Sequence, residues 1–342
     1  MWSFINNRGC RAFYISLYCF IIVSCSESLQ EFDPSVLKQT LCLDSNLNIK
    51  SEYIVVIGDI QEYTAGKGYD FYYNTTVNWI LSQHIQGVDI KCVLQLGDLT
   101  NYNAKEQYNV FYHYTLPMAE EVPYIACIGN HDYMWDKKGL IHNRYDTYFS
   151  DFVSFSLTDS LVLARFESGR MENVVVKNYI DGNPYYILVL EFGPRIEVLK
   201  WADAYIKSHR DCKFILMTHE FLNNKGERIA YNSTAEAQFR NTTWSSPEQV
   251  WQKLVKDNDN ILCVICGHNG FSNHLFSENS IGRQVPQILF NLQYQKNGGN
   301  GLIQLWEFPH GSDTVYIRTY STLLQQWYAD DDTHKFNFNY KY

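Results

Sequence analysis

The sequence predicts an α/β fold in which helices flank two packed, mixed β-sheets. Strand-like and helix-like segments alternate from residue 53 to residue 217, which favours parallel strands joined by crossover helices. After residue 288 strand-like segments follow one another without helices, which favours antiparallel pairing. A chain of 342 residues, 46% of them hydrophobic, is long enough to bury one large core.

The first elements follow from hydrophobic spacing. Residues 53–58 form a short apolar run typical of a buried strand. In 75–86, apolar side chains recur on one face of a helix, and 92–96 is the next strand. The same criteria predict a helix at 108–118, a strand at 124–128, a hairpin of 160–166 with 173–180, a strand at 185–191 and a helix at 194–208.

The later elements are predicted in the same way. A strand at 212–217 precedes a helix that begins at Ser246-Pro247-Glu248, a capping residue followed by proline at the first helical position. The remaining predicted strands are 261–266, 288–293, 302–308 and 314–322. The irregular, aromatic-rich segment 133–180 is the expected rim of a substrate pocket, because such insertions commonly carry binding residues.

The N-terminus has the organisation of a signal peptide. Arg8 and Arg11 precede an apolar stretch, 12–23, that is too short to span a bilayer as a helix. It ends in Ile22-Val23-Ser24-Cys25, which resembles the lipobox of bacterial lipoproteins. We expect removal of 1–24 and lipidation of Cys25, so that the protein lies in a bacterial cell envelope, outside the cytoplasm, attached to a membrane only by lipid. An ordinary signal peptide with an incidental cysteine is the alternative.

Beyond the signal peptide, the predicted organisation has three parts. Residues 25–50 are a tether with a short leading helix, 51–325 form the main domain, and 326–342 form a C-terminal tail. A net charge of −9 without a Lys/Arg cluster argues against nucleic-acid binding. The pair Cys263 and Cys266 has metal-binding spacing but no second pair to complete a site, so we expect small buried side chains there.

Five short polar clusters follow the predicted strands. They are Gly58-Asp59-Ile60-Gln61, Gly97-Asp98, Gly129-Asn130-His131-Asp132, Thr218-His219 and Gly267-His268-Asn269-Gly270. Ligands of open α/β sheets gather at the carboxyl ends of strands. Carboxylates, amides and imidazoles suit a divalent metal site. Each cluster alone is compatible with a simple turn, but their common position predicts one shared site.

In their order and spacing, these clusters resemble the motifs of the calcineurin-like metallophosphoesterases, over about residues 53–325. The resemblance implies a four-layer α-β-β-α sandwich and a site for two metals. The second-metal ligands of the family correspond to Asp98, Asn130, His219 and His268, a complete set. The first-metal ligands correspond to Asp59, Gln61, the shared Asp98 and Gly270, where the family has a second histidine.

The altered first set has consequences for the metal content. Gln61 can offer a carbonyl oxygen, whereas Gly270 has no side chain. His274 could substitute, although its position is more typical of a strand or rim residue. We expect divalent Mn, Fe or Zn, one ion firmly bound and a second bound more weakly, with a mononuclear site as the close alternative.

The resemblance also implies a mechanism. A water molecule activated by metal would attack phosphorus in line. His131 would contact the phosphate and assist the leaving oxygen, and Asp132 would orient His131, unless Asp132 simply caps a turn.

The function that follows is a metal-dependent phosphoesterase, hydrolysing a phosphomonoester or phosphodiester, on a cell-envelope lipoprotein. Its expected partner is the phosphate-ester substrate, with no nucleic acid, and we expect a monomer. The alternative is a surface lipoprotein that keeps the fold and one metal but has weak or no turnover, as Gln61 and Gly270 would allow. The aromatic content, 16%, would also suit carbohydrate binding, but aromatic side chains equally fill cores.

Overall fold

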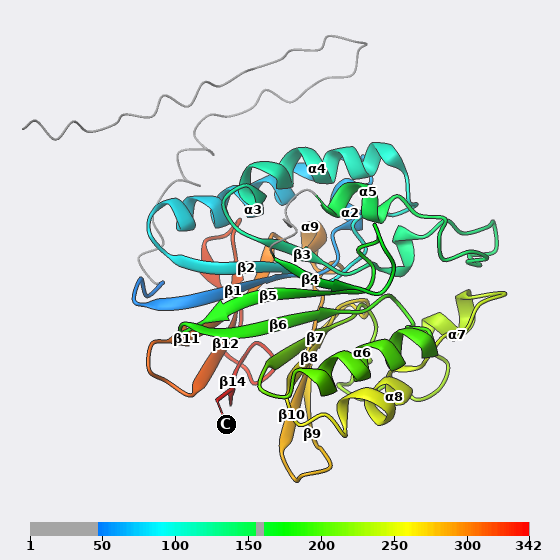
Figure 1. Cartoon of the computed structure of the whole chain (residues 1–342). Helices are drawn as coiled ribbons and strands as arrows, with labels where there is room; N and C mark the ends of the chain where they lie inside the picture. Colours follow the sequence, from blue (N-terminus) through cyan, green and yellow to red (C-terminus); the bar gives the residue numbers. More distant parts are fainter. Residues whose placement is uncertain (1–46, 155–160, 342) are drawn as a thin grey trace, which may run out of the picture.

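The structure, a computed structural model, describes residues 47–154 and 161–341. Two mixed β-sheets pack face to face, and helices cover their outer faces (Figure 1). This is the predicted four-layer α-β-β-α sandwich. The predicted signal peptide, the lipidation site Cys25 and most of the tether lie outside the described residues.

The first sheet has strand order β13-β12-β11-β1-β2-β3, and β14 pairs with β12. Its parallel part is β1 (Ser51–Ile57), β2 (Asp89–Gln95) and β3 (Tyr124–Ala126). Its antiparallel part is β11 (Leu302–Pro309), β12 (Thr314–Ser321), β13 (Gln326–Trp327) and β14 (Lys335–Asn339). Strand β1 therefore lies where the two parts meet.

The second sheet has strand order β4-β5-β6-β7-β8-β10-β9. Its parallel part is β6 (Asn183–Val189), β7 (Lys213–Met217), β8 (Ile261–Cys266) and β10 (Gln284–Phe290). Antiparallel strands at its two edges are β4 (Val162–Arg165), β5 (Val174–Ile180) and β9 (Ser272–Glu278). The predicted hairpin thus becomes β4 and β5.

Helices form the two outer layers. The first sheet is covered by α3 (Asp70–Ile85) and α4 (Lys105–Ala119), and the second by α6 (Ile196–Ser208) and α8 (Pro247–Val250), which continues into a π-helical turn at Trp251–Val255 (Figure 1). Short helices are α2 (Gln61–Thr64), α5 (Phe149–Val153), α7 (Thr234–Gln238), α9 (Lys296–Gly299) and the 3₁₀ turn Asn130–Asp132. Within 47–154 and 161–341, no helix combines the length and apolarity that a membrane span requires.

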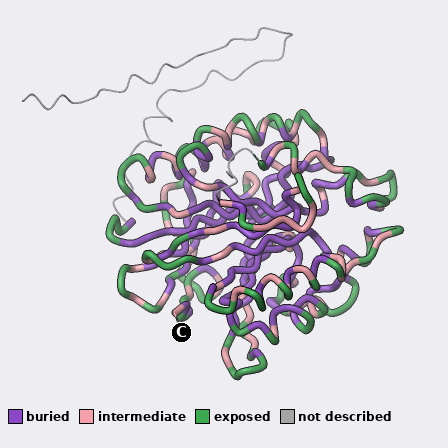
Figure 2. The backbone as a smooth tube through the Cα atoms, viewed as in Figure 1, coloured by how far each residue is buried: buried purple, intermediate pink, exposed green. Residues whose placement is uncertain are grey.

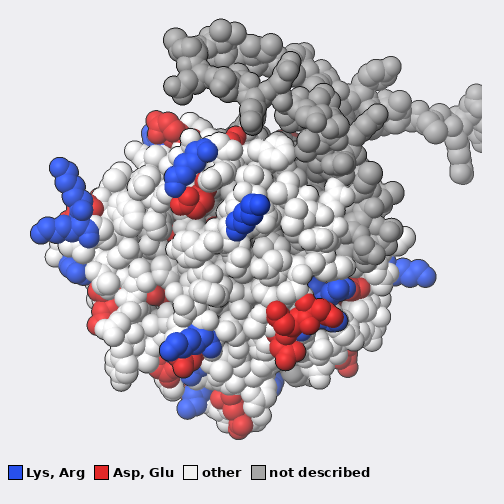
Figure 3. All heavy atoms as spheres, turned by 180° about the vertical axis from the view of Figure 1, so that it is seen from behind, with Lys and Arg blue, Asp and Glu red and all other residues white. Residues whose placement is uncertain are grey.

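The main apolar cluster fills the space between the sheets and extends to helices α3 and α4, and Figure 2 shows the buried strands at the centre of the molecule. Large aromatic side chains such as Trp79 and Trp306 are fully buried there. A second apolar cluster lies between the second sheet and helices α6 and α8. Among the described cysteines, Cys263 and Cys266 are buried and free, as expected, and so are Cys92, Cys127 and Cys212. On the face seen in Figure 3, basic side chains are scattered singly or beside acidic ones.

Two features differ from the sequence-based expectation. The segment 326–342, expected to be a tail, contributes β13 and β14 to the first sheet, and Phe338 and Tyr340 are buried in the core. Strand β9 was not anticipated, because most of its residues are half-exposed and it lies at a sheet edge, where hydrophobic alternation is weak.

Candidate metal centre

Four candidate ligands meet at the carboxyl ends of strands from both sheets. Asp98 follows β2, Asn130 follows β3, His219 follows β7 and His268 follows β8. Ligand atoms of Asp98, His219 and His268 all lie within 4.8 Å of one another. Nε2 of His219 is 3.1 Å from Oδ1 of Asn130 and 3.2 Å from Nδ1 of His268. The structure therefore brings together the set that the sequence predicted for the second metal.

Hydrogen bonds fix which nitrogen of each imidazole faces the centre. Nδ1 of His219 lies 2.6 Å from the carbonyl oxygen of Leu96, which can only accept, so this nitrogen carries a proton. Nε2 of His268 lies 2.7 Å from the hydroxyl of Thr234. Such contacts to the outer nitrogen orient metal-binding histidines. They leave Nε2 of His219 and Nδ1 of His268 for a metal.

The glycines of the motifs are required by close approach. A Cβ on Gly129 would lie 2.1 Å from Oδ1 of Asp98, and a Cβ on Gly267 would lie 2.6 Å from Oδ1 of Asp59. Contacts shorter than 3.0 Å force some atom to shift. The ligand loops can pack together only because these positions lack side chains.

Helix α7 supports His268 from outside the centre. Ser233 caps this short helix and Thr234 is its first residue. The buried carboxylate of Glu220 accepts hydrogen bonds from the backbone N–H groups of Thr234, at 2.6 Å, and Ala235. Glu220 thus anchors the residue that contacts His268.

The electrostatics of the centre favour a positive charge between the ring of His219 and the carboxylates. Burial lowers the pKa of His219, but Asp98 and Asp59 outweigh it and raise the pKa to about 10. Burial raises the pKa of Asp98, but the neighbouring imidazoles of His219, His131 and His268 together outweigh burial and lower the pKa below its ordinary value. Burial lowers the pKa of His268 to about 3, which keeps its imidazole neutral. A divalent cation can replace the proton on His219.

His131 and Asp132, the predicted catalytic pair, have different surroundings. Nδ1 of His131 lies 2.9 Å from the carbonyl oxygen of Asn101, and the ring packs edge-on against Trp135 with centroids 4.6 Å apart. Asp132 is fully buried and accepts hydrogen bonds from the backbone N–H groups of Leu99, Thr100 and Gly129.

The orienting role that the resemblance implied for Asp132 therefore belongs to the carbonyl of Asn101. Asp132 instead joins the loop that follows Asp98 to Gly129 at the start of the third cluster. Burial, and then the charge of Asp98, raise the pKa of Asp132 to about 7, against the opposing effect of these backbone hydrogen bonds.

The first-metal position is arranged differently. Oδ2 of Asp59 accepts hydrogen bonds from the side-chain amides of Asn291, at 2.6 Å, and Gln293, at 3.1 Å. Nε2 of Gln61 donates to Oδ2 of Asp98 at 3.1 Å, and Oε1 of Gln61 is buried with no hydrogen-bond partner in the described part of the chain. Burial raises the pKa of Asp59 well above its ordinary value. Asp59 thus lies beside the centre and faces two amide groups, whereas Gln61 directs its own amide N–H at Asp98.

The missing imidazole of the fifth motif has been replaced by another side chain. A Cβ on Gly270 would lie 1.9 Å from Cδ2 of Tyr294, so the tyrosine ring covers this position. His274 does not substitute, because it lies in β9 and stacks on Phe336 with centroids 4.3 Å apart. The signal in the sequence for the segment 291–294 is a group of polar residues directly after a buried strand.

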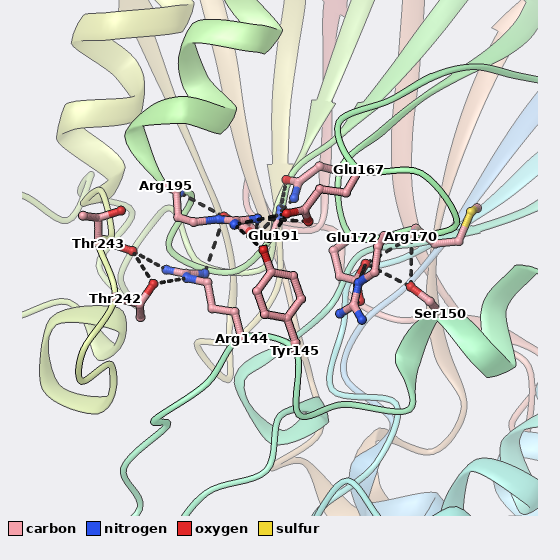
Figure 4. A network of polar contacts seen from close by, with 12 residues as sticks. Arg144, Tyr145, Ser150, Glu167, Arg170, Glu172, Glu191, Arg195, Thr242 and Thr243 are labelled. Atoms are coloured by element: carbon pink, nitrogen blue, oxygen red, sulfur yellow. Dashed lines mark hydrogen bonds and ion pairs between the residues drawn. The ribbon is translucent and has the colours of Figure 1, made fainter.

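Part of the predicted pocket rim is fixed by a network of ion pairs (Figure 4). The buried guanidinium of Arg144 donates to the carbonyl oxygens of Phe192, Gly193 and Thr243 and to the hydroxyl of Thr242. The Phe192 ring packs near His219 and His268, with centroids 5.9 and 6.1 Å away. Arg144 therefore joins the rim segment to the wall of the metal centre, and its donors are used within the protein.

Comparison with known proteins identifies a family whose sequence model matches the chain. The sequence model of the family described as calcineurin-like phosphoesterase matches residues 53–270, which is more than half of the chain. The uncharacterized protein YvnB of Bacillus subtilis is 26% identical over 221 residues, and the match spans 62% of this chain. It spans only 15% of the length of YvnB.

Two solved structures share low sequence identity with the chain. A conserved uncharacterized protein of Streptococcus pneumoniae, described as a predicted phosphoesterase, is 10% identical with a TM-score of 0.35, covering 84% of this chain and 98% of its own. Sulfate thiohydrolase SoxB of Thermus thermophilus, in complex with glycerol, is 8% identical with a TM-score of 0.42, covering 81% of this chain and 57% of its own.

Proposed function

Because this chain belongs to the calcineurin-like phosphoesterase family, we propose that it is a metal-dependent phosphoesterase that hydrolyses a phosphomonoester or phosphodiester. The observation that carries the proposal is the convergence of Asp98, Asn130, His219 and His268 on one small volume. Both imidazoles present the nitrogen that a metal needs. Mixed oxygen and nitrogen ligands suit divalent Mn, Fe or Zn.

The metal and the side chains have separate tasks in this proposal. A divalent metal held by these four residues supplies Lewis acidity toward a phosphoryl oxygen and toward water. Asp98 and Asn130 contribute oxygen ligands, and the hydrogen bonds to Leu96 and Thr234 keep the imidazoles in position. The substrate phosphate therefore lies at the carboxyl ends of β2, β3, β7 and β8.

His131 is the proposed general acid. Its Nδ1–H is engaged by the carbonyl oxygen of Asn101, so Nε2 is the atom that can hold and release a proton. In hydrolysis, water gives up one proton to solvent, its oxygen forms a bond to phosphorus, and the phosphorus–leaving-group bond breaks. The leaving oxygen takes the proton from Nε2, which regains a proton from solvent. Trp135 packs against the imidazole and restricts its movement.

Hydrolysis of bis-p-nitrophenyl phosphate and p-nitrophenyl phosphate with added Mn²⁺ tests the proposal. We expect turnover that is lost in Asp98→Asn and retained in Asp89→Asn, a matched change at an exposed position on β2. Absence of turnover, or equal turnover in both variants, would reject it. A metal-binding protein with little or no turnover is the second candidate, favoured by the altered first-metal position at Gly270.

The cellular location is a separate part of the proposal. We propose that Cys25 is lipidated and holds the protein at a bacterial membrane surface, outside the cytoplasm, which the signal-peptide pattern of 1–25 supports. Labelling of growing cells with a radioactive fatty acid tests this directly. We expect label in the wild-type chain and none in Cys25→Ala, and an unlabelled wild-type chain would contradict the lipid anchor.

A further inference from the structure

The carboxylate of Asp59 is almost fully used by groups of the protein. A carboxylate offers about four lone-pair positions to donors. Oδ2 accepts two amide N–H groups, from Asn291 and Gln293, and Oδ1 accepts the backbone N–H of His268 at 3.1 Å. Oδ1 also lies so close to Gly267 that even a Cβ would not fit between them. Few lone-pair positions of the Asp59 carboxylate therefore remain for a cation.

The amides that hold Asp59 come from the end of β10. Asn291 and Gln293 follow this strand, which runs parallel to β8, so their segment lies beside the loop that carries His268. Nδ2 of Asn291 donates to Asp59 and also to the carbonyl oxygen of His268, at 3.0 Å. Both amide side chains are buried. Their N–H groups compensate for the burial of the Asp59 carboxylate, as a bound metal ion would otherwise do.

The other ligands of a first metal are unsuited as well. Gln61 directs its amide N–H, not its oxygen, at Oδ2 of Asp98. The place of the second histidine is filled by the ring of Tyr294 against Gly270. Asp59 is not part of the cluster of mutually close metal-ligating groups that the described residues form from Asp98, His219 and His268. N–H donors therefore point where a cation would need oxygen or nitrogen lone pairs.

We propose that this protein binds one divalent metal, at Asp98, Asn130, His219 and His268, and that Asn291 and Gln293 replace the first metal as partners of Asp59. The proposal rests on the proposed function, because it presumes that the protein binds metal. Residue 59 is then a structural anchor between β1 and the loops after β8 and β10. Oε1 of Gln61, which has no hydrogen-bond partner among the described residues, remains as an acceptor toward the centre.

Metal content and magnetic coupling test the proposal without reference to turnover. The purified chain is loaded with excess Mn²⁺, freed of loose metal on a desalting column, and assayed by mass spectrometry of the element. We expect about one equivalent. Electron paramagnetic resonance of the fully loaded protein should show isolated Mn²⁺, because two ions bridged by one carboxylate lie only about 3.5–4 Å apart and couple.

Two matched variants assign the ion to its ligands. Asp59→Asn should keep one equivalent with affinity within about threefold of the wild type, measured by chelator competition. Asp98→Asn, the same chemical change, should weaken affinity by more than about tenfold. Folding of both variants is checked by circular dichroism. If Asp59→Asn does not fold, the stoichiometry and resonance spectrum of the wild-type protein still decide between one bound metal and two.

The outcomes separate this proposal from the proposed function. Two equivalents, or a coupled spectrum, in the wild-type protein would overturn the mononuclear site and leave the phosphoesterase proposal intact. A loss of one of two equivalents in Asp59→Asn would have the same meaning. No bound metal in the wild-type protein would overturn both proposals.

Discussion

Nε2 of His268 lies 2.7 Å from the hydroxyl of Thr234, so a residue of helix α7 determines how the fifth motif presents its ligand nitrogen. Thr234 is itself held by the buried carboxylate of Glu220 through its backbone N–H. The metal centre therefore depends on a helix that no family motif includes. The ring of His268 is oriented from outside, as in many metal sites.

We predict that Thr234→Val weakens metal binding by about 10–100-fold, because the isosteric methyl group cannot pair with Nε2 of His268. Thr234→Ser keeps the hydroxyl and should bind metal as the wild type does. Chelator competition measures both affinities. Equal affinity in the valine and serine variants would mean that the hydroxyl does not position His268.

We predict that His131→Gln lowers kcat by about 10²–10⁴-fold toward alkyl phosphate esters. The loss should be smaller for p-nitrophenyl esters, because p-nitrophenolate leaves without a proton. Metal content should not change, since Nδ1 of His131 bonds to Asn101. His113→Gln, an exposed change on α4, is the control. An equal loss for both kinds of ester would argue against a general acid.

Asp132→Ala is predicted to destabilise the fold by about 2–5 kcal/mol, because it leaves the buried N–H groups of Leu99, Thr100 and Gly129 without an acceptor. Asp132→Asn keeps one acceptor oxygen, so its free energy of unfolding should decrease less than that of the alanine variant. Urea unfolding, followed by circular dichroism, measures the change. A stable alanine variant with reduced kcat would instead return Asp132 to a catalytic role.

Arg144→Met should lower stability by about 3 kcal/mol, since it removes four hydrogen bonds to the segments 192–193 and 242–243 and leaves Glu191 with one cation fewer. Arg210→Met, at an exposed position, should have little effect. Thermal unfolding provides the comparison. If the Arg144 variant unfolds like the wild type but binds substrate poorly, Arg144 contacts the substrate.

Acidification should destabilise the packing of β9 on β14 through His274. Burial lowers the pKa of His274 below its ordinary 6.5, while nearby Asp332 opposes the shift only weakly. Between pH 6.5 and the lower folded value, the unfolded chain binds a proton that the folded chain does not, so stability falls as pH falls. One proton contributes at most about 1.4 kcal/mol per pH unit.

His274→Phe tests this pH dependence. Nδ1 of His274 is buried and has no hydrogen-bond partner within 47–154 and 161–341, and the ring stacks on Phe336, so phenylalanine should fit the position. We expect a flatter decline in unfolding free energy from pH 7 to pH 5. His334 and His268, whose pKa values burial also lowers, contribute to the remaining slope, and Asp132, whose pKa is raised to about 7, opposes it. An unchanged slope would assign the effect to other groups.

Much of the fold was predictable because its central strands are buried on both faces. Such strands appear as continuous apolar runs, as β6 and β8 do, and each is bounded by polar turns. Edge strands lack this signal, so β9 and β13 were missed. The predicted boundary between domain and tail at residue 325 is wrong, because β14 extends the first sheet of the domain by pairing with β12.

The candidate ligands were predictable from their positions after strands, but their partners were not. Hydrogen bonds such as that of Asn291 with Asp59 join residues 232 positions apart, and only the sheet order brings them together. The same holds for Asn101, whose backbone carbonyl rather than its side chain contacts His131. A sequence motif records side chains and cannot show such backbone contacts.

The pairing of β1 with β11 has a consequence for how the chain acquires its structure. Ser51 lies opposite Pro309, and Ile57 lies opposite Ile303, so the middle of the first sheet joins the two ends of the described chain. During synthesis, β2 follows β1 early, but β1 waits for some 250 further residues before β11, its neighbour on the other side, exists. Contacts of such long range slow folding and expose strand edges meanwhile. The anchor residue Asp59, directly after β1, is thus among the last parts of the site to find its partners.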